Sequence, residues 1–180
     1  DVDVMFTSSQ GEVQGPSETI PGKTRRTYKA NDYVTAGDVA TTITSSGGGV
    51  ICERAFYGPA RNWATTSLGS PVATRGWDMP EGATDGGMET WVLVYNPGDD
   101  TTFVSLSLLT SEGLVEPPEL QNLDLAAHER LTVCVNNFVT TYHVSTHVDA
   151  TSGVVCERSI YWPAGAGAAG LHGVLHRALR

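Results

Sequence analysis

The sequence is short of positive charge. Its 180 residues contain 11 Lys and Arg against 20 Asp and Glu, a formal net charge of -9 at pH 7. Such a balance repels phosphate backbones and anionic membrane surfaces, which argues against nucleic acid as a partner. No apolar run reaches the roughly 20 residues of a membrane-spanning helix, and the N-terminus lacks a basic and apolar leader. We expect no membrane insertion, and the leader of an exported protein would not be in this chain.

Cysteine is also scarce. The three cysteines, Cys52, Cys134 and Cys156, are an odd number without the spacing of a zinc site, so one disulfide at most is expected. Cys52 and Cys156 occupy matching places in the repeat described next. This placement favours small buried strand residues. A bridge between Cys134 and Cys156 is the alternative.

Charged residues make up only 17% of the chain, whereas Gly, Thr, Ser and Val are plentiful. A β-branched, turn-rich composition favours many short strands over helices. The length suits one large domain or two small ones. The composition therefore predicts an all-β protein.

An internal repeat sets the architecture. The segment VICERAFYGPA at 50–60 returns as VVCERSIYWPA at 154–164. The shared residues that we take as structural anchors of the repeat are Glu53, Arg54 and Tyr57 in the first copy and Glu157, Arg158 and Tyr161 in the second.

The repeat continues upstream. Residues 24–43 match 129–148, which places Asn31 opposite Asn136, and the alternating Val2, Val4 and Phe6 match Val104, Leu106 and Leu108. The segment 76–100 has no counterpart in the first copy. We therefore predict that 1–59 is the C-terminal half of a first unit, 60–75 a linker or entry strand and 76–163 a complete unit. A first unit without its front strands would be a fragment of a longer array or would take strands from elsewhere.

The complete copy carries about seven short alternating segments, the number expected of an immunoglobulin-like β-sandwich. Thr90 to Tyr95 and Thr102 to Leu109 flank the turn Asn96-Pro97-Gly98-Asp99, which predicts a hairpin. The Gly- and Ala-rich tail at 164–180 contains LHGVLHRALR, which could form a short helix. The predicted fold is thus all-β, with tandem immunoglobulin-like sandwiches of which the first is incomplete.

Several strings carry a family resemblance: GWDMPEGATDGGMETWVLVYNPGDD from Gly76, ERLTVCVNN from Glu129, HVSTHV from His143 and VVCERSIYW from Val154. Together they resemble the DUF5719-type repeat domain of actinobacterial and related cell-surface proteins. The resemblance covers nearly all of 76–162, and its later half recurs in 2–57. It implies an extracellular β-sandwich module without catalytic role or cofactor. Cys134 and the tail depart from the family pattern.

Candidate chemistry is sparse. A Glu-Arg pair could polarise a substrate, but adjacent strand residues face opposite sides, so a structural ion pair or a backbone anchor is the better interpretation of Glu157 and Arg158. His143 and His147 would lie about 13 Å apart on a strand, too far for one metal ion. No Gly-x-Ser-x-Gly elbow is present. Asp99-Asp100 and Asn136-Asn137 suit turns as well as calcium. We predict no enzyme activity, no cofactor and no metal.

Four tryptophans suggest saccharide stacking as an alternative. Trp91 is predicted to lie in the core, whereas Trp63, Trp77 and Trp162 are candidates for an interface between units or for exposure.

The leading hypothesis is a secreted or cell-surface structural or adhesive repeat protein. Its partners would be other copies of itself or neighbouring repeats, and it could assemble head-to-tail into a filament by strand complementation. A carbohydrate-binding module that recognises surface glycans is the alternative.

Overall fold

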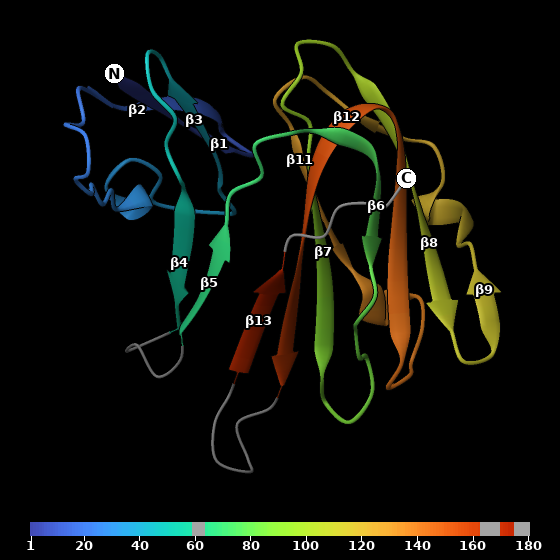
Figure 1. Ribbon diagram of the computed structural model, residues 1–180. Helices are drawn as coiled ribbons and strands as arrows, with labels where there is room; N and C mark the ends of the chain where they lie inside the picture. Colours follow the sequence, from blue (N-terminus) through green and yellow to red (C-terminus); the bar gives the residue numbers. More distant parts are fainter. Residues whose placement is uncertain (59–63, 163–169, 175–180) are drawn as a thin grey trace.

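The computed structural model describes residues 1–58, 64–162 and 170–174, which consist of antiparallel strands and three single-turn 3-10 helices (Figure 1). The predicted all-β class is confirmed. Within these ranges no helix has the length and apolar character to cross a membrane.

The longest strand, β12 (Val144–Trp162), organises the C-terminal part of the chain (Figure 1). Its first half pairs with β8 (Thr102–Thr110) and β6 (Thr74–Met79), and its second half pairs with β7 (Glu89–Tyr95) and β13 (Gly170–Val174). Because one strand serves two sets of neighbours, the sheet curls around its own inner face.

Shorter elements complete this sheet, whose main path is β10-β8-β12-β7-β11. They are β9 (Gly113–Val115), η3 (Pro118–Leu120), β10 (Leu123–Leu125), β11 (Arg130–Cys134) and η4 (Val135–Asn137). We call residues 74–174 the complete unit.

The predicted hairpin between the strands at 90–95 and 102–109 is wrong, because β12 lies between β7 and β8 in the sheet. The buried Asn96 explains the crossing. Its amide nitrogen donates to the carbonyl oxygens of Asp100, Leu125 and Ala126 at 2.8–3.1 Å. The turn therefore connects the two halves of the curled sheet, and β7 and β8 do not pair with each other.

Alternate residues of the strands point into the curl and form its core. The fully buried large side chains include Trp77, Met79, Val92, Val94, Val104, Leu106, Leu108, Leu125 and Val148. Trp77 is only 1% exposed, and its indole nitrogen donates to the carbonyl oxygen of Val154 at 2.8 Å. The expectation that Trp77 fills an interface between units is therefore corrected: this side chain belongs to the core.

The N-terminal part forms a smaller sheet of order β2-β1-β3, with β1 (Val2–Ser8), β2 (Gly11–Glu18) and β3 (Ala40–Ser45). A single turn, η1 (Ala30–Asp32), precedes β3. A hairpin of β4 (Glu53–Tyr57) and β5 (Ala64–Leu68) follows. We call the described residues of 2–68 the first unit; β5 falls within the range predicted as a linker or entry strand.

The repeated sequence adopts the same strand register in both units. Val4 pairs with Ile43 in the first unit, and their counterparts Leu106 and Val148 pair in the complete unit. The hairpin β4–β5 corresponds likewise to the end of β12 with β13. The first unit buries a much smaller core, formed by Val2, Val4, Phe6 and Val34.

Two further expectations are corrected. All three cysteines are free: Cys156 points into the core, whereas Cys134 lies on β11, and β7 separates the two strands. Two strand spacings amount to about 9–10 Å, beyond the reach of a disulfide. The predicted tail helix is wrong at 170–174, which form β13, and 175–180 lie outside the described residues.

We predict that Leu106→Ala lowers the free energy of unfolding by about 2–5 kcal/mol, because it leaves a cavity in the curl. The neighbouring Leu109 is 54% exposed. Leu109→Ala should therefore change stability by no more than about 0.5 kcal/mol. Urea denaturation followed by tryptophan fluorescence measures both. Equal losses in the two variants would contradict the assigned core.

Candidate binding cleft between the two units

The first unit lies against the outer face of the sheet half formed by β11, β7 and the end of β12. Strand alternation that buries Val92 and Val94 turns Trp91, Leu93 and Tyr95 outward. The Tyr95 hydroxyl lies 3.2 Å from the Thr42 hydroxyl on β3. Strand β5 runs beside β13 (Figure 1). The two units therefore share an interface.

Ion pairs connect the units across this interface. Arg54 on β4 donates to the carboxylate of Glu157 on β12, which also accepts from the Ser67 hydroxyl at 2.9 Å. The Glu157 side chain is only 17% exposed. A charge-assisted contact of this kind is stronger than a neutral hydrogen bond, so Glu157 holds the β4–β5 hairpin to the complete unit.

A second set of contacts lies nearby. Asp38, in the loop before β3, accepts from the Thr132 hydroxyl at 3.0 Å and lies 3.3 Å from an Arg130 Nη atom. The Arg130 side chain is 11% exposed. Burial lowers the pKa of this guanidinium, and the charge of Asp38 acts in the opposite direction. Asp38 is the anion that offsets the desolvation of Arg130.

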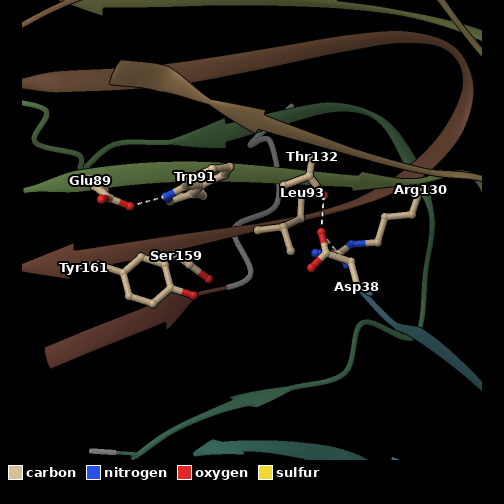
Figure 2. Close-up of a pocket in the computed structure, with 8 residues that line it drawn as sticks. All are labelled: Asp38, Glu89, Trp91, Leu93, Arg130, Thr132, Ser159 and Tyr161. Carbon is tan, nitrogen blue, oxygen red and sulfur yellow. Dashed lines mark hydrogen bonds and ion pairs between the residues drawn. The ribbon is translucent and has the colours of Figure 1, made fainter. Parts of the chain in front are cut away.

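A cleft of about 270 Å³ lies among these contacts. Its lining residues are Asp38, Glu89, Trp91, Leu93, Arg130, Thr132, Ser159 and Tyr161. Figure 2 shows Glu89 and Trp91 at one end and Asp38 with Arg130 at the other, with Leu93 between them and Tyr161 near Ser159.

The two ends of the cleft differ in chemistry. The Trp91 indole nitrogen donates to Glu89 at 2.9 Å, which fixes the ring (Figure 2). Burial raises the pKa of the Tyr161 phenol. The cleft thus offers two aromatic rings beside hydroxyls, carboxylates and a guanidinium. Its lining contains neither histidine nor cysteine, and no group of three metal-ligating side chains occurs in the described part of the chain.

The structure distributes the predicted anchor residues over different environments. Tyr161 lines the cleft, and Arg54 and Glu157 pair beside it. Arg158 turns inward with 1% exposure and donates to the carbonyl oxygen of Glu81. Glu53 is exposed, and so is Tyr57, at 56%.

The predicted tryptophan residues also lie in different environments. Trp162 is 39% exposed near the end of β12, and Trp63 lies outside the described residues. The prediction that Trp91 is a core residue is wrong, because its strand places alternate residues on the outer face. Residues 91–95 are apolar throughout, so the sequence did not show that Trp91, Leu93 and Tyr95 face the cleft. Asp38 and Glu89 left no signal in the sequence.

No family model and no curated protein matches the chain. Among solved structures, it is similar to the crystal structure of Thermotoga maritima 1070, with a TM-score of 0.51 and 16% identity, over 58% of this chain and 94% of that one. It is also similar to the Anabaena sensory rhodopsin transducer, with a TM-score of 0.42 and 16% identity, over 50% and 99% of the two chains. At this identity the likeness concerns the fold. The DUF5719-type resemblance stays a prediction.

We predict that Glu157→Gln loosens the first unit from the complete unit by about 1–2 kcal/mol, because it removes the charge from a half-buried hydrogen-bonded pair. Faster hydrogen exchange of the β4 and β5 amides would report this. The repeat provides the matched control: Glu53→Gln, at the equivalent exposed position of the first unit, should leave exchange unchanged. The same exchange rates in both variants would contradict the role of Glu157.

Proposed function

We propose that the protein is a non-catalytic structural or adhesive repeat protein of the bacterial cell surface, whose first unit associates with neighbouring units by β-strand addition. One observation carries the proposal. In the complete unit β12 has partners along both edges, whereas its counterparts β3 and β4 each have a partner along one edge among the described residues. The family resemblance supports surface display. Addition at such an edge is heterologous and would produce a head-to-tail filament.

Side-chain exposure supports the same interpretation. Thr41 on β3 is exposed, but its counterpart Thr146 on β12, which pairs with Met79 of β6, is only 3% exposed. An uncovered strand with a short polar face is a template for pairing with another chain. The tandem immunoglobulin-like arrangement belongs to this proposal, in which the described residues of the first unit form the later half of a sandwich.

We predict concentration-dependent association of the purified chain in light scattering, and that Thr41→Lys abolishes it, because a charge on the uncovered face blocks strand addition. Thr44 is also exposed, on the opposite face of β3, and corresponds to the exposed Asp149. Thr44→Lys should therefore leave association intact. A chain that stays monomeric at every concentration would refute assembly between copies.

The cleft supports a second candidate, the binding of a saccharide from surface glycans. Trp91 and Tyr161 provide aromatic rings, and Asp38, Arg130 and Ser159 provide polar groups that suit a hydroxylated ligand. The half-buried Trp91, fixed by Glu89, is the observation that favours it. This candidate needs no acid-base pair.

For the saccharide candidate we predict glycan-array binding that Trp91→Ala weakens at least about tenfold, equal to about 1.4 kcal/mol of lost contact. Trp162→Ala removes a tryptophan outside the cleft and serves as the control. Isothermal titration with the best array ligand measures both variants. A flat array with the intact protein would dismiss this candidate.

A further inference from the structure

Most of the charges beside the cleft offset one another. Asp38 pairs with Arg130, and Glu157 pairs with Arg54. The two pairs form one network, because Arg54 and Glu157 also act electrostatically on Arg130. Two members of this network are cations and two are anions, so their formal charges cancel. An acidic ligand would therefore find both guanidinium groups already paired with a carboxylate.

The carboxylate of Glu89 lies outside this network. The Trp91 indole nitrogen donates to its Oε2 atom at 2.9 Å, but this donor is neutral. Among the described residues, Glu89 belongs to no ion pair. The lining of the cleft contains two carboxylates, Asp38 and Glu89, and one guanidinium, Arg130. The cleft therefore carries an excess negative charge, and Glu89 is its source.

Two aromatic side chains lie next to this carboxylate. On paired strands, Glu89 lies opposite Tyr161, and Trp91 lies opposite Ser159. The four side chains point to the same face of the sheet, because every second residue of a strand does so. Figure 2 shows this group of residues on one side of the cleft, away from Asp38 and Arg130. A negative charge beside two aromatic rings attracts a cation through both the charge and the faces of the rings.

Small residues explain the hollow beside Trp91. Ser159 lies across from Trp91, and Gly173 on β13 lies across from Ser159. Ser159 is 5% exposed and lines the cleft with a short side chain, and a glycine has none. The cleft of about 270 Å³ is slightly smaller than the roughly 300–1,000 Å³ of most small-molecule sites. The ligand that fits it is therefore short.

We propose that the saccharide bound in the cleft is an amino sugar, whose positively charged amine contacts Glu89 while its ring packs against Trp91. This inference rests on the saccharide candidate and names the chemistry of the sugar. A charged amine donates to a carboxylate in a charge-assisted hydrogen bond, which is roughly twice as strong as a neutral one. The net charge of -9 of the whole chain also favours the approach of a cation.

Glu89 distinguishes amino sugars from sugars of other charge. A neutral sugar offers this carboxylate only neutral hydroxyl donors, which form the weaker hydrogen bonds. An acidic sugar would place a second negative charge in the cleft, and Arg130 is already paired with Asp38. Like charges at short range repel each other. The expected order of affinity is therefore amino sugar, neutral sugar and acidic sugar.

The test compares two disaccharides by isothermal titration into the intact protein. One is the β-1,4-linked glucosamine dimer, at a mildly acidic pH that keeps its amines protonated. The other is cellobiose, in which a hydroxyl takes the place of each amine. We expect the glucosamine dimer to bind at least about tenfold more tightly. Trp91→Ala should weaken the binding of both dimers, because the ring contact is common to them.

Glu89→Gln separates the charge from the position of the ring. The glutamine keeps an oxygen that can accept from the Trp91 indole, so the preference for the glucosamine dimer should fall below about twofold without loss of the ring contact. Glu112→Gln is the matched control, because it removes the same charge from the turn before β9, outside the cleft. This variant should keep the preference. Both variants should unfold at the unsubstituted temperature, since Glu89 and Glu112 are exposed.

Three results would overturn the amino sugar: equal affinity for the two dimers, a preference that Glu89→Gln leaves intact, or one that Glu112→Gln reduces as much. The last result would mean that the overall charge of the protein attracts the amine. Array glycans that bind while neither dimer does would also overturn it and would leave the saccharide candidate intact. A flat array without binding of either dimer contradicts the saccharide candidate itself, and this proposal with it.

Discussion

A β-strand has two edges and two faces, and the pairing of β12 along both edges is the constraint on which the complete unit depends. Its first half lies between β8 and β6 and its second half between β7 and β13, so the side chains of both halves meet in one core. Gly153 lies at the bend between these halves; a Cβ atom there would come within 3.0 Å of Ala73. Among the described residues, the duplicated strands β3 and β4 each pair along one edge only. Their smaller core follows directly.

The cleft between the units lies where the two copies of the repeat differ in their contacts. Arg54 repeats Arg158, but the carbonyl oxygen that Arg158 binds belongs to the β6–β7 connection, for which the described residues of the first unit contain no equivalent. The guanidinium turns to Glu157 instead and ties the β4–β5 hairpin to the complete unit. Arg158 thus makes a contact inside its own unit, whereas its counterpart Arg54 makes a contact between the two units. The cleft lies beside this second contact.

The features that the sequence predicted are those set by local periodicity and by the repeat. Alternation placed the strands of the complete unit, and the repeat paired Asn31 with Asn136 and Arg54 with Arg158. Contacts between distant segments were not predictable: the position of β12 between β7 and β8 depends on the buried Asn96. Trp91 was misassigned because an apolar run does not show which of its residues face outward, and only the register with β11 and β12 decides this. Asp38 lies in a loop whose partner Arg130 is 92 positions away in the chain.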